Sequence, residues 1–431
     1  MNTDMPQIKI RSLDFIIFLF MTLFIGKGSF VVAATDYHAN PIGMGLLALS
    51  IIYLFAAKTN NKLSPHVKPL LLVLFVWVIV HLSVIDYSYT PFFYVGLIVY
   101  FLGGLAIAKH YGFDMVYYYE KTTYVLAFIS LPLWALQMAG GTNFLNSLPF
   151  VLRNTAGTSD YSLLLYTING QPSAEWYGNV IRNCGCAWEP GLFATMLTLA
   201  FVFRMFINKG KLILKDRHNI VLLLALITTF STTGYITLFL LVGLHILITS
   251  RMGIGRKIVY GIIGLGVFSW VYSFTFMSDK IKARSDFSEF VTETGKYSQM
   301  EEPFTVDRFE GIVLDYANML DAPLLGYGMN RNFSYVANTF SPLILTSNSI
   351  TKPLAQMGIP LGVFLFVLLF LSVKKISAYY NNTFLILLMC LLISAMSYNM
   401  FENPIIRALQ FLILIIPSYS LDGRSNNFEH K

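Results

Sequence analysis

Apolar runs of membrane-spanning length, separated by polar segments, recur along the whole chain. About 20 helical residues cross the hydrocarbon core of a bilayer, and by that measure the pattern predicts about twelve transmembrane helices. They lie near residues 12–34, 41–57, 68–86, 90–108, 115–138, 188–207, 218–231, 234–250, 258–277, 351–373, 382–400 and 404–420. The predicted fold class is therefore all-α, a polytopic membrane helical bundle formed by residues 1–431 as a single domain.

The composition also indicates a membrane protein. Only 12% of the 431 residues are charged and 55% are hydrophobic, whereas roughly a quarter of the residues in soluble proteins are charged. The net charge of +7 would suit a nucleic-acid partner. The basic residues, however, stand beside the apolar runs, as the positive-inside rule describes. We therefore expect no nucleic-acid partner.

Along the chain, short loops rich in basic residues alternate with loops on the other side of the membrane. Because Lys and Arg concentrate in cytoplasmic loops, this alternation predicts that both termini are cytoplasmic. The basic loops contain Lys9 and Arg11; Lys58, Lys62 and Lys68; Lys109 and His110; Lys209, Lys211, Lys215 and Arg217; Arg251, Arg256 and Lys257; Lys374 and Lys375; and Arg424 and Lys431.

The apolar stretch 218–250 has basic clusters at both ends, so the chain must cross and return within it. We expect two short helices that meet at Gly234, inside the polar turn 231–235. A polar turn at membrane depth is tolerated where protein buries it or where it lines a wet cavity. A plain tight hairpin is the alternative.

Two segments on the predicted outer side, 139–187 and 278–350, are too long to be mere connections. The second has apolar residues at helical spacing, which predicts an amphipathic helix over 305–321 that packs over the outer mouth of the bundle. Thr305 is its expected cap, and the run Asp321-Ala322-Pro323 is its expected end. The apolar positions are Phe309, Ile312, Val313, Tyr316, Met319 and Leu320.

The predicted span at 188–207 opens with Glu189-Pro190-Gly191. Proline at the first helical position and an acid beside it are typical of a helix start. Arg182 lies in the same outward-facing turn. Charges at a membrane entrance are unfavourable unless they form ion pairs or take part in function. These residues alone leave two interpretations open, a structural ion pair and a catalytic site.

Four arginines lie on the predicted outer side, against the positive-inside bias: Arg182, Arg284, Arg308 and Arg331. Arginine binds phosphate through paired hydrogen bonds and keeps its charge. Each one singly could be a solvated residue. Together with aromatic side chains they suit a sugar attached to a phosphate. The aromatic residues are Trp176, Tyr177, Tyr327 and Tyr335.

The chain contains no phosphate-binding loop, no dinucleotide fingerprint and no zinc pattern. We therefore expect neither a metal nor a cofactor. No predicted cytosolic segment is large enough to bind a nucleotide-activated donor, so the energy must come from a substrate that is already activated. The cysteines Cys184, Cys186 and Cys390 are expected to be small apolar fillers without a disulfide.

Three stretches then occur in a characteristic order. Arg182-x-x-Gly185-x-x-x-Glu189-Pro190-Gly191 opens a mid-chain span. Arg308 and its amphipathic helix lead to Pro323-Leu324-Leu325-Gly326-Tyr327-Gly328-Met329-Asn330. Ser347-Asn348 precedes Leu354, Gln356, Gly358 and Gly362. Over about residues 175–372, this series resembles bacterial O-antigen polymerases of the Wzy type and the related O-antigen ligases.

The resemblance implies a GT-C-like glycosyltransferase of the bacterial inner (plasma) membrane, with the segment 278–350 as its large periplasmic loop. Such an enzyme joins undecaprenyl-diphosphate-linked oligosaccharide repeat units into a polymer at the periplasmic face. Donor and acceptor are both lipid-linked, membrane lipid surrounds the site, and a chain-length regulator protein is a partner to consider. A diphosphate is a good leaving group, so catalysis needs charge stabilisation and one base.

By this resemblance, Arg182 and Arg308 hold the diphosphate, and Arg284 is a weaker third candidate. Glu189 is the expected base for the acceptor hydroxyl, or else it positions Arg182. The expected substrate-binding residues are Tyr327, Asn348 and Trp176.

Two positions depart from the family pattern. The family often has Ser-Arg-Gly where this chain has Thr232-Thr233-Gly234, and ligases commonly have a histidine where this chain has Ser347. Both favour a polymerase over a ligase that transfers polymer to lipid A core, which is the first alternative. A lipid-linked oligosaccharide flippase or other transporter is the second. Transporters place polar residues within the spans near the midplane, whereas intramembrane charges are few here, with Lys27 the clearest.

Overall fold

The computed structural model describes residues 11–25, 31, 41–59, 61–85, 91–149, 151–153, 161–168, 180–211, 213, 215–246, 253–255, 257–259, 261–262, 266, 269, 304–306, 308–346, 348–380, 385–388, 390–391 and 403–416. The predicted spans 258–277 and 382–400 lie mostly outside these residues. The described part is mainly helical, as the sequence predicts.

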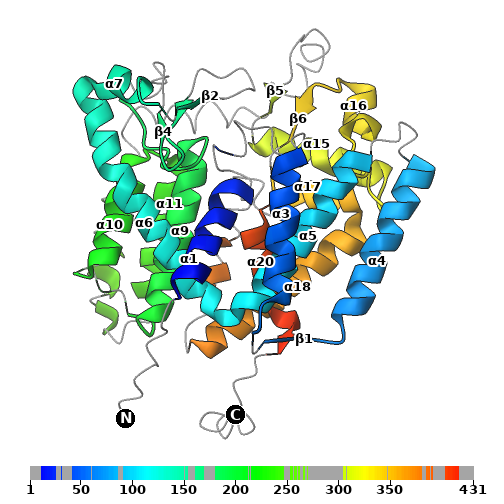
Figure 1. Ribbon diagram of the computed structural model, residues 1–431, viewed down its shortest axis with the longest axis horizontal. Helices are drawn as coiled ribbons and strands as arrows, with labels where there is room; N and C mark the ends of the chain where they lie inside the picture. Colours follow the sequence, from blue (N-terminus) through cyan, green and yellow to red (C-terminus); the bar gives the residue numbers. More distant parts are fainter. Residues whose placement is uncertain are drawn as a thin grey trace, which may run out of the picture.

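The longer helices stand side by side in one bundle (Figure 1). They are α1 (Ser12–Phe20) with η1 (Met21–Ile25), α3 (Pro41–Ala56), α4 (Val67–Val80) with η2 (His81–Ile85), α5 (Pro91–Tyr111), η3 (Gly112–Asp114), α6 (Met115–Leu136), α9 (Pro190–Ile207), α10 (Arg217–Thr228), α11 (Thr232–Leu244), α18 (Ile359–Tyr379) and α20 (Pro404–Phe411) with η9 (Leu412–Leu414).

Short elements cover one end of the bundle, at the top of Figure 1, which we call the loop end. They are η4 (Gln137–Gly141), α7 (Thr142–Asn146), β2 (Leu152–Arg153), β3 (Tyr161–Ser162), β4 (Thr167–Ile168), β5 (Phe304–Thr305), α15 (Arg308–Asp321), η7 (Arg331–Phe333), α16 (Tyr335–Thr339), β6 (Ile344–Leu345) and α17 (Thr351–Met357). Strands β2, β3 and β4 form an antiparallel sheet, and β5 pairs with β6 in parallel.

The opposite end, which we call the basic end, is closed by the antiparallel pair β1 (Lys62–Leu63) and β7 (Ile415–Ile416). Lys375 donates to the carbonyl oxygens of Ile413 and Ile415, and Lys109 donates to that of Phe55. The structure therefore brings basic residues from separate loops to the same end of the bundle.

Three helical stretches among the described residues are long and apolar enough to cross a membrane: Tyr94–Asn146, Pro190–Ile207 and Ile359–Tyr379. Six shorter apolar helices accompany them: Ser12–Phe24, Gly45–Ala56, Val67–Ser83, Arg217–Thr228, Thr232–Leu244 and Ile405–Leu414. These helices support a membrane protein of the all-α class. The span predicted at 351–373 is divided at Gly358, whose φ is +79°, so that α17 precedes the apolar helix α18.

Helix α9 is the most deeply buried of the three long apolar stretches and packs against α6, α10 and α11. Pro190 is its first residue and Glu189 its N-cap, as expected. A Cβ at Gly234 would lie 2.8 Å from that of Ala194, so the glycine permits the close approach of α11 to α9.

Helices α5 and α20 also approach each other closely. A Cβ at Gly104 would lie 2.8 Å from Cγ of Arg407, so the missing side chain makes room for the arginine stem. The Arg407 guanidinium lies 4.3 Å from the ring centroid of Phe101 and donates to Gln410. Sequence reasoning overlooked this buried charge, because a single arginine hardly alters an apolar run.

The hairpin after Asp216 consists of two short helices, as expected, but its break is not at Gly234. Helix α10 ends at Thr228, Phe230 has a φ of +46°, and the Ser231 side chain accepts a hydrogen bond from the Gly234 amide. Ser231 therefore caps α11, and Gly234 lies in the first turn of that helix. Thr229 and Ser231 are buried in protein.

The amphipathic helix of the second long segment is present as α15, and it ends at Asp321 as predicted. Its start is different, because Thr305 belongs to strand β5 and is not a cap. The orientation also differs in part. Leu314 and Met319 are buried, whereas Tyr316 and Leu320 are 58% and 65% exposed, and the polar Asp315 is completely buried.

Candidate functional site

The segment that leads into α9 is held at the loop end by a buried asparagine. Asn183 Nδ2 donates to the hydroxyls of Ser130 on α6 and Thr228 on α10, at 3.1 and 2.9 Å. Its Oδ1 accepts from the Gly185 amide at 2.9 Å. Gly185 has a φ of +52°, and a Cβ there would lie 2.4 Å from the Phe193 ring. This turn therefore requires glycine.

Arg182 projects from this segment to the turn between α10 and α11. Its Nε donates to the carbonyl of Thr229 at 3.1 Å, and its Nη2 donates to that of Phe230 at 3.2 Å. These carbonyls follow the end of α10, where the helix dipole favours a cation. Glu189, the N-cap of α9, comes from the same segment and is partly buried. Arg182 therefore stabilises the break in the hairpin.

A second polar cluster lies at the same end, around Asp315 of α15. The carboxylate is completely buried. Its Oδ1 accepts from the hydroxyl of Thr346 at 2.8 Å, and its Oδ2 accepts from that of Thr351 at 2.7 Å. Burial raises the pKa of Asp315 to about 6, although the two hydrogen bonds and the nearby Lys352 lower it. One carboxylate thus joins α15 to the segment that returns to α18.

Two cations act electrostatically within this cluster. Burial lowers the pKa of the Lys352 ammonium, the Asp315 carboxylate raises it, and the Arg331 guanidinium lowers it again. Lys352 therefore lies near the Asp315 carboxylate, whose oxygens already accept from neutral hydroxyls, and Arg331 lies near Lys352.

Tyr327 and Asn348, both expected to bind substrate, belong to this Asp315 cluster. Tyr327 is buried, packs against Met319 and Ala355, and forms a side-chain hydrogen bond with Gln356. Burial raises the pKa of its phenol. Asn348 Oδ1 accepts from the amides of Ile350 and Thr351, at 2.7 and 3.2 Å. It thereby positions Thr351, which donates to Asp315.

Arg308 is the first residue of α15 and precedes Asp315 by two helical turns, so the two start from the same face of the helix. The Arg308 side chain, Trp176 and Arg284 lie outside the described residues. The structure brings Tyr327 and Asn348 together with Asp315. Arg182 and Glu189 share a different segment at the same end of the bundle.

Sequence reasoning did not single out Asp315 or Lys352 as site residues. A signal was available for Asp315, because it lies between the apolar positions Ile312 and Met319 and therefore near the face expected to be buried. A buried carboxylate needs hydrogen-bond partners. For Lys352 there was no comparable signal, because a lysine at the start of a predicted span is ordinarily solvated.

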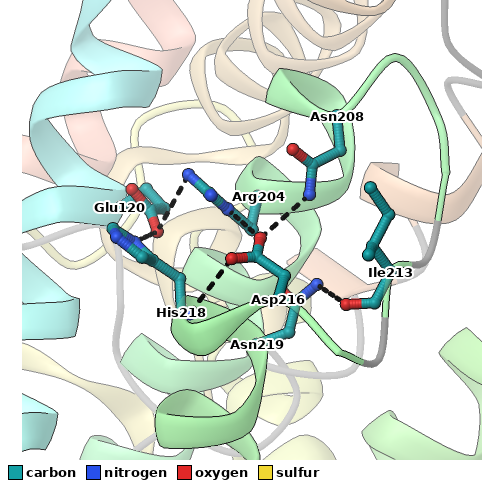
Figure 2. Close-up of polar contacts among 7 residues, drawn as sticks. All are labelled: Glu120, Arg204, Asn208, Ile213, Asp216, His218 and Asn219. Atoms are coloured by element: carbon teal, nitrogen blue, oxygen red, sulfur yellow. Dashed lines mark hydrogen bonds and ion pairs between the residues drawn. The ribbon is translucent and has the colours of Figure 1, made fainter.

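A third polar cluster lies at the basic end, among α6, α9 and α10 (Figure 2). Arg204 Nε lies 2.5 Å from Asp216 Oδ2, and Arg204 Nη1 lies 3.9 Å from Glu120 Oε1. His218 Nδ1 lies 2.6 Å from the same Glu120 oxygen. Asn208 donates to Asp216, and Asp216 caps α10 through the His218 amide. Here the ionic groups pair with one another.

Within the described ranges no group of three or more His, Cys, Asp or Glu side chains could hold a metal ion. The three cysteines are buried and free, as predicted.

In the comparisons with known proteins, no protein-family model and no curated protein matches this chain.

Proposed function

We propose that this protein is a membrane-embedded glycosyltransferase of surface-polysaccharide assembly. In this proposal it has about twelve spans, cytoplasmic termini and a GT-C-like architecture. It joins undecaprenyl-diphosphate-linked oligosaccharide repeat units at the periplasmic face of the bacterial inner membrane, and its loop end faces the periplasm. The family resemblance of the segments around Arg182 and Arg308 motivates the proposal.

The observation that supports it most is the pair of neighbouring cations in the Asp315 cluster. Lys352 lies near the Asp315 carboxylate, which two hydroxyls already satisfy, and Arg331 lies near Lys352. Helix α15, which begins at Arg308, joins this cluster through Asp315. Two adjacent cations at the loop end suit the charged oxygens of a diphosphate.

In the proposed reaction, the bond between the anomeric carbon of the growing chain and its diphosphate oxygen breaks. The diphosphate leaves with the electron pair. A hydroxyl oxygen of the incoming lipid-linked repeat unit forms the new bond to that carbon, and its proton passes to a base. The products are a longer lipid-linked chain and free undecaprenyl diphosphate.

The residues divide into two roles in this scheme. Glu189 is the proposed base, because a carboxylate near a helix start at the loop end can accept the proton. Arg308, Arg331 and Lys352 neutralise charge on the leaving diphosphate. Arg182 holds the α10–α11 break against the segment that carries Glu189, and Tyr327 and Asn348 shape the Asp315 cluster.

A gel of surface polysaccharide from cells that lack the gene tests the proposal. We expect lipid that carries a single repeat unit, and long polymer after complementation with the wild-type gene. Arg308→Ala and Glu189→Gln should fail to restore polymer, whereas Arg217→Ala, an exposed arginine at the basic end, should restore it.

Three other results would contradict the proposal. Polymer that accumulates on the undecaprenyl carrier would indicate a ligase. Repeat units trapped on the inner side would indicate a transporter. Full polymer synthesis by both Arg308→Ala and Glu189→Gln would remove the assigned site.

A further inference from the structure

The segment Leu324–Met329, which follows α15, lies directly against the transmembrane part of the bundle. Trp77 of α4 donates its indole N–H to the carbonyls of Leu325 and Met357, at 3.1 and 3.2 Å. One side chain of a predicted span therefore holds two separate parts of the loop end, the segment after α15 and the last residue of α17.

His81, the first residue of η2, extends this contact one helical turn beyond Trp77. Its Nδ1 lies 2.9 Å from the carbonyl oxygen of Trp77, and its Nε2 lies 3.4 Å from that of Gly326. The ring is completely buried, and its centroid lies 3.8 Å from that of Trp77. Both neighbours are acceptors, so the ring holds the loop in the tautomer that carries its proton on Nε2 and donates to Gly326.

The glycines of this segment make the close approach possible. A Cβ at Gly328 would lie 2.6 Å from the Tyr94 hydroxyl and 2.7 Å from Cδ2 of His81, and Gly328 has a φ of +82°. Gly326, with a φ of +72°, would place a Cβ 2.3 Å from the carbonyl oxygen of Gln356. Neither position accommodates a side chain.

The same segment is hydrogen-bonded to α17. The amide of Tyr327 donates to the carbonyl of Ala355 at 3.1 Å, and that of Gly328 donates to Gln356 at 2.9 Å. Helix α17 begins with Thr351 and Lys352, which both interact with Asp315. A contact that holds Leu324–Met329 on α4 therefore also holds the cluster around Asp315.

We propose that Trp77, His81 and Tyr94 form a latch that positions the Asp315–Lys352 cluster on the bundle. They are positioning residues, because they contact the loop and not the reacting groups. The effect on transfer rests on the proposed function, whereas the latch itself is a structural contact that can be measured separately.

The test is thiol labelling of the full-length protein in detergent, with Ala355→Cys as the reporter. Ala355 is completely buried and packs against Tyr327, so its labelling rate reports release of the segment. The peptide is followed by mass spectrometry, and the native cysteines 184, 186 and 390, which are buried, serve as internal references.

His81→Phe keeps a ring and removes both ring nitrogens, whereas His81→Gln keeps an N–H donor that can reach Gly326. We expect His81→Phe to raise the labelling rate at 355 by about tenfold, the effect of one lost hydrogen bond. His81→Gln should bring the labelling rate most of the way back to that of the wild type. The references should not change. His66→Phe, the exposed histidine at the start of the same helix, should leave the labelling rate unchanged.

The activity arm uses the same variants without the reporter cysteine. His81→Phe should lower the turnover of lipid-linked repeat units by about tenfold, in step with labelling, and His81→Gln should rescue it. Unchanged labelling at 355 in His81→Phe overturns the latch. If His81→Phe raises labelling but leaves turnover unchanged, while Asp315→Asn loses turnover, the latch exists but the positioning role is overturned. If no variant affects polymer synthesis, Asp315→Asn included, both the proposed function and the positioning role are wrong. The labelling experiment still shows in that case whether the latch exists.

Discussion

Two aspartates at opposite ends of the bundle show how a partner's charge determines what a carboxylate can do. At the basic end, burial raises the pKa of Asp216, but hydrogen bonds from Arg204 and Asn208 and the Arg204 charge outweigh it, so the pKa is lowered overall. At the loop end, Asp315 receives two neutral hydroxyls, and burial raises its pKa to about 6. The first carboxylate is locked in its charged form, and the second is close to titration.

The two clusters differ in charge balance as well. In the basic-end cluster the carboxylates of Glu120 and Asp216 face Arg204 and His218. In the cluster around Asp315, Lys352 lies near the carboxylate and Arg331 lies near Lys352. Ionic groups that satisfy one another hold helices together, whereas two adjacent cations attract a ligand of opposite charge. We therefore expect mutations in the basic-end cluster to affect stability and mutations in the Asp315 cluster to affect transfer.

The largest contrast is expected from removing one charge at each end. Lys352→Met should lower transfer by about a hundredfold, because an electrostatic contact to developing charge is lost. Asp216→Asn should leave transfer per folded molecule nearly unchanged. Turnover of lipid-linked repeat units by equal amounts of folded protein measures both. Equal losses in the two variants would contradict the assignment of separate roles.

For stability we expect the opposite order, with a larger loss in Asp216→Asn than in Lys352→Met. Asp216→Asn leaves Arg204 without its closest carboxylate, and we expect a loss of about 2 kcal/mol, below the value for a fully buried pair because these side chains are partly exposed. Thermal unfolding in detergent measures the change. His66→Phe at the start of α4 is the control, and a Tm equal to that of the wild type in Asp216→Asn would contradict the structural role.

The prediction with the sharpest sign is the pH dependence of stability. A raised folded-state pKa means that the stabilising contribution of Asp315 is complete below the unfolded value of about 3.9 and is lost as the pH rises to about 6. Relative to Asp315→Asn, the wild type should therefore lose about 2–3 kcal/mol over this range and remain level above it. For Asp216 the sign is reversed, since its contribution is present above the unfolded pKa and is lost as the pH falls through the lowered one.

Local signals correctly predicted several elements. Glu189-Pro190 marks the start of α9, the amphipathic period marks α15, and the length of 218–250 requires a hairpin. These features depend on neighbouring residues, whose capping preferences and periodicity can be read directly. The break at Phe230 could not be located, because its place depends on Arg182, a residue far away in sequence.

The candidate site was predicted only in outline for the same reason. Tyr327 and Asn348 were chosen from their motifs, but their contacts with Gln356 and Thr351 follow from how the loop packs. Asp315 and Lys352 became candidates only when burial and charge were known. The roles assigned to the side chains of Arg308, Arg284 and Trp176 stay predictions.

By itself, the sequence determined that this is an apolar, helical membrane protein with its polar residues gathered in two long segments. Hydrophobic length and charge patterning suffice for that conclusion, because the bilayer requires them of any spanning helix. Only the tertiary structure decided that Asp315 is buried under two threonine hydroxyls and that His81 meets Gly326. Such contacts join residues distant in sequence, and burial, which sets the pKa of Asp315, is a property of the packed molecule.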